Sequence, residues 1–390
     1  MQQPQLDQPV VLPAGSSVTK AKPKKYYPAL TGIRALAAYM VFFHHFNPLR
    51  TNDVSVNFLG DIVQEFHIGV TIFFVLSGFL ITARYIDRIT ISTKWFINYM
   101  RNRVARIYPL YFLLTICTFI VSALHLQPNA SDGWPTYSRA AKILVPIFNI
   151  TFIRGFFIDI KASGIKQGWS LTVEECFYIA APFLLLWLAR NRKSIFFFPF
   201  LIALPGLLLV ALIGSPDRFS GFFGDYRFLF NYTFFGRCVE FVCGMGLALI
   251  VNKYTYQQRL NGLFTALGFG WILLCLIGLA LIQSPVDGSG WFNYTTIAIN
   301  NLILPIGVAA TFYGLVYERT WISRLFESKT FDLLGKSSYA FYLVHMGIFS
   351  NFIEDHITTN YYIMFLLLNV VSIALYYFIE KPAQKLIAKS

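Results

Sequence analysis

The chain contains little charge, and acidic residues are the scarcer charged type. Only 13% of its 390 residues are charged, and 32 lysines and arginines against 19 aspartates and glutamates give a formal net charge of +13. Together with 56% hydrophobic and 18% aromatic residues, this composition excludes an ordinary soluble globular protein. The basic residues recur in short clusters between apolar runs, so the charge does not indicate a nucleic-acid partner. It indicates a polytopic membrane protein whose basic loops contact a lipid bilayer.

The sequence also lacks any CxxC pair and any cysteine spacing typical of a metal site. Its cysteines are Cys117, Cys176, Cys238, Cys243 and Cys275. Because all five fall in apolar runs, we interpret them as small core residues and expect no metal site.

Neither end contains a segment long and apolar enough to form a separate soluble domain. Residues 1–26 contain Gln, Pro and Ser, lack an apolar core and include four lysines, which predicts a disordered cytoplasmic tail. Residues 27–382 are predicted to form one membrane domain, and residues 383–390 a second cytoplasmic tail.

Ten apolar runs are long enough to cross a hydrocarbon core of about 30 Å. They cover residues 28–47, 65–85, 106–126, 169–189, 194–214, 228–251, 261–282, 295–317, 333–352 and 361–380. The shorter run 143–153 predicts a re-entrant or interfacial segment. We therefore expect an all-α fold of about ten transmembrane helices in one bundle.

Charge alternates between the loops that join these runs. Loops such as the one with Arg190, Arg192 and Lys193 are basic, whereas those on the other side, such as the loop with Asp217 and Asp225, are neutral or acidic. By the positive-inside tendency, this alternation predicts that both termini are cytoplasmic.

The first apolar run contains Arg34 near its start and His44 and His45 near its end. Ionisable side chains inside a membrane usually face a bundle interior, a cavity or a substrate. Eleven helical steps bring Arg34 and His45 to nearly the same face, roughly 16 Å apart along the axis. His44 lies about a quarter of a turn away.

A basic cluster, Arg101, Arg103 and Arg106, lies at the cytoplasmic end of the third run. Orientation and lipid contact explain it without any further function. Alternatively, the guanidinium groups form a cradle for a phosphate-rich cytoplasmic molecule, since their geometry suits phosphate.

Two adjacent carboxylates, Glu174 and Glu175, lie in the fourth run and point about 100° apart, so at most one faces a given cavity. Glu174 shares a face with Ser170 and Tyr178. This stripe is either a structural hydrogen-bond network or part of a site.

Three further polar sets lie in later runs. Arg237 and Glu240 are spaced to pair within one helix, which favours a structural role. Glu380 and Lys381 suit a snorkelling ion pair at the boundary. In the ninth run, Ser338, Tyr342 and His345 share one face and Tyr339 lies a third of a turn away; His345 either bonds a neighbouring helix or contacts a substrate.

Several segments, taken in order, resemble the acyltransferase 3 family of integral membrane O-acyltransferases. They are ALTGIRALAAYMVFFHH, GVTIFFVLSGFLI, RNRVARIYPLY, GWSLTVEECFY, RCVEFVCGMG, GKSSYAFYLVH and FIEKP. The resemblance runs from about Tyr27 to Pro382, and the order of several motifs is more specific than any one of them. Some members carry an additional hydrolase-like domain after the membrane part, which we do not expect here because the chain ends at Ser390.

This resemblance implies a ten-helix enzyme of the cytoplasmic (inner) membrane that transfers an acyl group, commonly acetyl from acetyl-CoA. The acceptor is a hydroxyl of a carbohydrate, a glycolipid or another surface molecule, and no permanently bound cofactor is implied. The family's paired Arg and His match Arg34 and His45. His45 suits the role of general base.

The remaining site residues are assigned by side of the membrane. Predicted CoA-phosphate ligands are Arg34, Arg101, Arg103 and Arg106. Glu174 is a third catalytic candidate, and acceptor-binding candidates are Trp169, Ser170, Tyr342 and His345. Direct transfer and transfer through an acyl-enzyme are both compatible with these residues.

A transporter or flippase of a lipid-linked sugar or small molecule is the main alternative, because such proteins also contain intramembrane Arg, His and Glu. The lack of repeated halves argues mildly against it. A membrane scaffold or sensor does not explain so many polar groups in apolar runs.

Overall fold

The structure, a computed structural model, describes residues 26–49, 58–90, 92–127, 133–253, 261–282 and 293–388. Within these ranges the chain is helical, and its only extended pairing is an isolated bridge between Phe157 and Phe222. The all-α expectation is confirmed. The tail predicted at residues 1–26 lies outside the described residues except for Tyr26.

The α-helices are α1 (Pro28–His45), α2 (Phe58–Gln64), α3 (Gly69–Tyr85), α4 (Thr93–Ala123), α5 (Arg139–Ile150), α6 (Trp169–Arg190), α7 (Phe198–Ile213), α8 (Tyr226–Tyr232), α9 (Phe234–Lys253), α10 (Leu263–Ile282), α11 (Tyr294–Ala298), α12 (Leu304–Tyr317), α13 (Trp321–Phe326), α14 (Lys329–Val344), α15 (Ile348–His356), α16 (Tyr361–Leu375) and α17 (Lys381–Ala388). The short turn η1 (Glu65–Ile68) joins α2 to α3. Two π-helical turns, η9 (Ile299–Ile303) and η10 (Tyr376–Glu380), interrupt later helices.

Eight helical stretches in the described ranges are long and apolar enough to cross a membrane. They are Phe58–Tyr85, Thr93–Ala123, Lys166–Arg190, Arg192–Ile213, Tyr226–Lys253, Leu263–Ile282, Tyr294–Tyr317 and Tyr361–Ala388. The other two predicted spans correspond to α1, which contains three ionisable side chains, and α14, which has only 16 residues. An integral membrane protein is therefore supported, and the count of ten is not confirmed.

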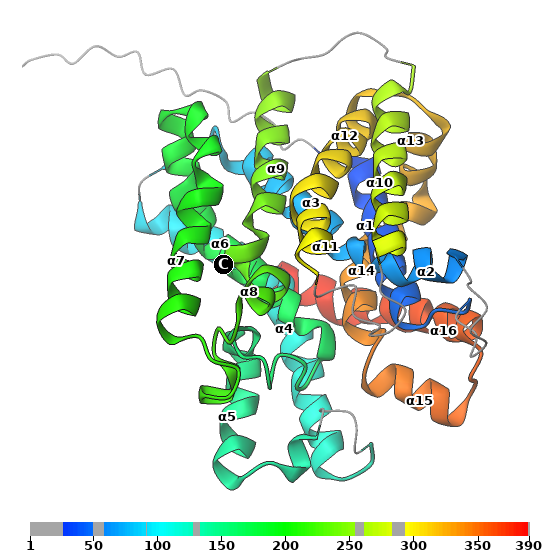
Figure 1. The fold of residues 1–390 in the computed structure, drawn as a ribbon. Coiled ribbons are helices and arrows are strands. Elements are labelled where there is room, and N and C mark those ends of the chain that lie inside the picture. Colours follow the sequence, from blue (N-terminus) through cyan, green and yellow to red (C-terminus); the bar gives the residue numbers. More distant parts are fainter. Residues whose placement is uncertain are drawn as a thin grey trace, which may run out of the picture.

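The bundle is built around a few closely packed helix pairs (Figure 1). The helix α3 packs along α9, α10 packs along α12, and α1 packs against both α14 and α3. Two buried apolar clusters meet at α1 and α3, one extending to α4, α6 and α14 and the other to α10 and α12. The polar groups of the site lie in the middle of the first cluster.

Two predicted spans are broken in the structure. The run 333–352 consists of α14 and α15, because the chain turns at Gly347, whose φ of +105° disfavours any residue with a Cβ. The run 228–251 is divided into α8 and α9 by Thr233, which has an extended backbone. Both breaks place backbone groups and a helix end within the bundle.

Other boundaries also move. The third span begins at Thr93, because the side chain of Ser92 accepts a hydrogen bond from the Trp95 amide at 3.1 Å and caps the longer helix α4. Most of the run 143–153 belongs to the 12-residue helix α5, which begins earlier, at Arg139, and lies at the same end of the molecule as α15 (Figure 1). Residues 381–388, predicted to be largely a tail, form α17.

Candidate active site

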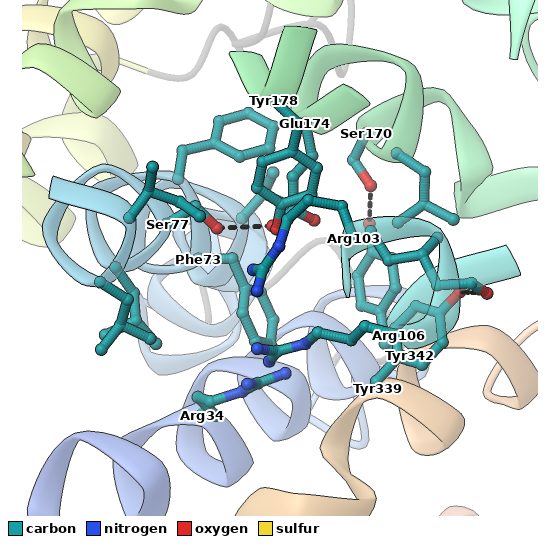
Figure 2. A pocket seen from close by; sticks show the side chains of 17 residues that line it. Arg34, Phe73, Ser77, Arg103, Arg106, Ser170, Glu174, Tyr178, Tyr339 and Tyr342 are labelled. Atoms are coloured by element: carbon teal, nitrogen blue, oxygen red, sulfur yellow. Dashed lines mark hydrogen bonds between the residues drawn. The ribbon is translucent and has the colours of Figure 1, made fainter. Parts of the chain in front are cut away.

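A pocket of about 700 Å³ opens between α1, α3, α4, α6 and α14. Apolar residues from α3, including Val70, Phe73 and Leu80, form one wall. Polar side chains from the other four helices face this wall (Figure 2). The pocket thus combines a hydrophobic surface with a small set of convergent charged and hydroxyl groups, which is typical of sites for organic molecules.

Three arginines lie together in this pocket, which we call the arginine pocket. Arg34 comes from the second turn of α1, and Arg103 and Arg106 are one turn apart on α4. Figure 2 shows their guanidinium groups pointing toward one another. Arg103 is 6% exposed, and its Cζ lies 5.5 Å from the centre of the Tyr178 ring.

None of these three guanidinium groups forms an ion pair with a carboxylate in the described parts of the chain. The Nε atoms of Arg34 and Arg103 are buried without a hydrogen-bond partner among the described residues. Because partly buried charges cost free energy unless they are paired, three converging cations indicate a site for an anion. Guanidinium geometry suits phosphate in particular.

Hydroxyl groups from α3 and α6 surround Glu174. The Ser77 hydroxyl donates to Glu174 Oε1 at 2.5 Å, and the Tyr178 hydroxyl donates to the same oxygen (Figure 2). Ser170 and Tyr342 share a hydrogen bond of 2.7 Å between α6 and α14. Glu174 lines the pocket, whereas Glu175 does not.

His45, the last residue of α1, does not line the arginine pocket. Its side chain is exposed, and its ring lies 4.7 Å from the ring of His44 and 5.5 Å from that of His345. Because α1 is one continuous helix, Arg34 and His45 lie roughly 16 Å apart along it. His45 is therefore placed beyond the arginine pocket, near the other end of the helix.

His345 connects this histidine to the pocket wall. It is fully buried, its Nδ1 lies 2.7 Å from the Tyr342 carbonyl oxygen, and its Nε2 has no partner among the described residues. The rings of Tyr342 and His345 are 5.5 Å apart. Tyr342, His345 and His45 thus form a row that leads out of the arginine pocket.

Two predicted ligands lie elsewhere. Arg101 does not line the pocket, because it is two residues from Arg103 and therefore on another side of α4. The Trp169 ring lies 5.8 Å from Cζ of Arg237 and packs on that buried group instead.

The Arg237–Glu240 pair predicted within one helix is confirmed. Arg237 Nη2 donates to Glu240 Oε1 at 2.6 Å, and both side chains are buried. The snorkelling pair of Glu380 and Lys381 is wrong. Glu380 is buried and accepts a hydrogen bond from Gln384 at 2.9 Å, whereas the Lys381 ammonium lies 5.0 Å from the Tyr377 ring centre.

Several lining residues were not predicted from the sequence. Phe73, Ser77 and Tyr339 line the pocket, and Tyr339 does so in place of Ser338, which bonds the Gly335 carbonyl oxygen of its own helix. The sequence does contain a feature that could have indicated Ser77. Its hydroxyl and the neighbouring glycine interrupt the otherwise bulky apolar run 65–85. Gln167 was also missed; its side-chain amide donates to the Tyr342 carbonyl oxygen at 2.8 Å and fixes the break after α14.

The sequence model of a family described as an acyltransferase domain matches residues 27–380. The chain belongs to this acyltransferase family. The resemblance inferred from the motifs is therefore confirmed, over nearly the whole membrane part of the chain.

Named relatives of this family member come from Staphylococcus aureus. O-acetyltransferase OatA of strain NCTC 8325 / PS 47 and that of strain COL are each 26% identical over 384 residues, covering 93% of this chain and 58% of the relative. A second protein of strain COL, whose name gives it provisionally as an O-acetyltransferase, is 25% identical over 389 residues, covering 94% of this chain and 59% of the relative. This chain therefore spans about three fifths of the length of these relatives. No solved structure matches it.

Proposed function

We propose that this protein is a membrane O-acyltransferase that moves an acyl group, most commonly acetyl from acetyl-CoA, onto a hydroxyl of a cell-surface or exported carbohydrate or glycolipid. The observation that carries the proposal is the arginine pocket, where three guanidinium groups converge without a carboxylate partner in the described structure. Family membership and the names of the relatives support acyl transfer to oxygen.

The charge and the hydrophobicity of the arginine pocket both suit CoA as the donor. Phosphates of CoA suit Arg34, Arg103 and Arg106, and an apolar arm suits the wall formed by α3. The acyl end then lies toward Tyr342 and His345, beyond which His45 stands. An arm that is extended along α1 covers the roughly 16 Å between Arg34 and His45.

The reaction requires a base for the acceptor hydroxyl, and His45 is that base in our proposal. The acceptor O–H loses its proton to the imidazole while its oxygen bonds to the thioester carbonyl carbon. The tetrahedral oxyanion then collapses, the C–S bond breaks, and the CoA thiolate takes the proton from His45. The hydroxyls of Ser170 and Tyr342, already held in one hydrogen bond, are the candidate donors to the oxyanion.

Glu174 acts as a positioning residue in this proposal. Its carboxylate accepts hydrogen bonds from both Ser77 and Tyr178, and it thereby orients the hydroxyls along the wall that the donor arm passes. A negative charge opposite the three guanidinium groups also limits their mutual repulsion.

The proposed orientation places both termini on the cytoplasmic side of the inner membrane. Arg103 and Arg106 then lie toward the cytoplasm, where CoA thioesters are present, and His45 lies toward the outer side. The carbohydrate acceptor approaches from that outer side, near His345.

The test uses purified protein in lipid vesicles with labelled acetyl-CoA and a set of candidate glycans. We expect release of free CoA and labelled glycan, and we expect His45→Ala to lower the rate by about 100-fold or more, the usual contribution of a general base. His356→Ala is the control, because His356 is exposed on α15 and its ring stacks on Phe352 of the same helix.

Full transfer by His45→Ala at normal protein levels would show that His45 is not the base. Movement of a lipid-linked sugar without any CoA release would instead support a transporter or flippase. The two results separate the enzyme from its main alternative.

A further inference from the structure

The helix α14 ends inside the bundle, and side chains hold the groups at its end. Because the chain turns at Gly347, the last carbonyl groups of α14 have no partner within the helix. The side-chain amide of Gln167 donates to the carbonyl oxygens of Tyr342 at 2.8 Å and of Leu343 at 2.6 Å. His345, which directly follows α14, places its Nδ1 2.7 Å from the same Tyr342 oxygen.

The contact with Tyr342 determines which ring nitrogen of His345 carries hydrogen. A carbonyl oxygen only accepts hydrogen bonds, so Nδ1 must be the donor, and in a neutral ring Nε2 is then a bare acceptor. A charged ring would be a buried cation, and none of the ion pairs among the described residues includes His345. The environment therefore favours the neutral ring with hydrogen on Nδ1.

The bond to Tyr342 leaves Nε2 of His345 unused. The side chain is fully buried, and Nε2 has no partner within the part of the chain that the structure describes. A buried acceptor without a donor costs free energy. Because a role at the end of α14 needs only Nδ1, the unused Nε2 requires a separate explanation.

His45 is a hydrogen-bond donor placed beside this acceptor. The centres of the His45 and His345 rings are 5.5 Å apart, and their planes differ by 27°. Two imidazole rings joined by one N–H···N bond have centres about 5 Å apart, so the spacing suits such a bond. His45 is exposed at the end of α1 and its ring can turn, whereas the buried His345 ring is held by Tyr342.

From this geometry we infer that His345 positions His45 for catalysis. Nε2 of His345 accepts a hydrogen bond from one ring nitrogen of His45, and the other nitrogen of His45 faces the hydroxyl of the acceptor molecule. The inference rests on the proposed function, which it deepens by adding a positioning residue behind the proposed base. A third group that orients the base is a recurring feature of acyl-transfer sites.

The proton transfers of the proposed reaction are unchanged by this arrangement. The hydroxyl of the acceptor molecule gives its proton to the bare nitrogen of His45, and the CoA thiolate later takes that proton. The hydrogen that His45 donates to Nε2 stays on His45, and His345 remains neutral throughout. His345 thus fixes the tautomer and orientation of His45 and stabilises the charged ring that forms.

Two substitutions separate the roles of the two nitrogens of His345. The amide of asparagine lies near the position of Nδ1, and that of glutamine lies near the position of Nε2. His345→Asn therefore keeps a donor for the Tyr342 carbonyl oxygen and removes the acceptor at Nε2, whereas His345→Gln keeps an acceptor there. In both variants that carbonyl oxygen retains its bond from Gln167.

The measurement is CoA release in vesicles, with the glycan that the wild-type protein acetylates. We expect His345→Asn to lower kcat about tenfold, the effect of losing one hydrogen bond in the transition state, and His345→Gln to lower it less than threefold. The KM values for acetyl-CoA and for the glycan should move less than twofold. His356→Asn, on the exposed surface of α15, is the matched control and should keep wild-type activity.

Three outcomes overturn the inference. Wild-type kcat in His345→Asn would show that Nε2 has no part in the reaction. A greater loss in His345→Gln than in His345→Asn would show that only the bond to Tyr342 matters. A raised KM for the glycan at unchanged kcat would make His345 a residue that binds the acceptor molecule.

A double variant distinguishes positioning from an independent role. Because His345 acts through His45, His345→Asn should cause no further loss of the residual activity in a His45→Ala background. A further tenfold loss there also overturns the inference. Thermal unfolding in detergent micelles shows which variants fold, and His345→Ala, which lacks both nitrogens, replaces His345→Asn in this cycle if the latter does not.

This inference and the proposed function fail in different ways. If the wild-type protein releases no CoA with any glycan, acyl transfer itself is wrong. If CoA is released and His45→Ala loses activity while His345→Asn keeps it, acyl transfer and the base stand, and His345 only holds the end of α14.

Discussion

At the scale of single residues, the most informative groups are the arginines of α4. Arg103 and Arg106 are three residues apart and therefore share one face of the helix, whereas Arg101 points elsewhere. Their shared face meets Arg34 of α1 in the arginine pocket. The cluster on α4 thus contains two arginines that line the arginine pocket and one, Arg101, that does not. Substitution of a lining arginine should therefore weaken donor binding more than substitution of Arg101.

The first prediction concerns these two kinds of arginine. Arg106→Gln should raise the KM for acetyl-CoA by about 10- to 100-fold, because a hydrogen bond to a charged group contributes about 1.5–3 kcal/mol. Arg101→Gln is the matched control and should change it less than threefold. The measurement is CoA release against acetyl-CoA concentration in vesicles, and equal effects of both variants would contradict the assignment of the arginine pocket to the donor.

At the scale of helices, close backbone contact between α3 and α9 organises the bundle. A Cβ added at Gly78 would lie 2.1 Å from the Phe241 carbonyl oxygen, and one added at Gly244 would lie 2.0 Å from that of Val75. Gly78 is therefore a helix-packing residue, whose missing side chain lets the two backbones approach closely. Its neighbour Ser77 faces the arginine pocket instead, so one dipeptide serves both packing and the site.

The second prediction tests this helix contact. Gly244→Ala should destabilise the protein by about 1–3 kcal/mol, because the new methyl group meets backbone that cannot move independently. Gly278→Ala is the control, since a Cβ there meets nothing within 4 Å, and it should be neutral or slightly stabilising. The measurement is thermal unfolding in detergent micelles, and equal midpoints for the two variants would show that the helices can separate at no cost.

At the scale of the whole molecule, the arginine pocket and His45 lie toward opposite ends of α1, and the rings of Tyr342 and His345 lie between them. The proposed reaction uses this arrangement, because a cytoplasmic donor and an outer acceptor meet at His45 without either crossing the bundle. Orientation in the membrane is therefore part of the mechanism.

The third prediction tests that orientation. Lys193→Cys and Asp217→Cys place exposed thiols just before and just after α7, at its two ends. An impermeant maleimide added to intact cells should label only Asp217→Cys, and both should react in opened membranes. Labelling of Lys193→Cys in intact cells would reverse the orientation and place the arginine pocket away from cytoplasmic CoA.

Much of the bundle was predictable from apolar length and charge alternation, because a membrane allows only a few backbone solutions. The breaks at Thr233 and Gly347 were not predicted, because both interrupt runs that remain apolar on either side. Hydropathy measures how readily a segment transfers into lipid. It does not show where neighbouring parts of the protein can form hydrogen bonds with the backbone groups that a break in a helix leaves open. The predicted ion pair of Glu380 failed for a related reason, since sequence alone does not show how deeply a helix end is buried.

The sequence by itself determined what helical periodicity controls: the shared faces of Arg103 and Arg106 and of Glu174 and Tyr178, and the pairing of Arg237 with Glu240. Only the tertiary structure decided which faces meet. Its packing of α1 against α3 and α14 brought Arg34 to the arginines of α4 and His45 to His345. The physical reason is that periodicity acts within one helix, whereas a pocket is enclosed by side chains that several helices pack together.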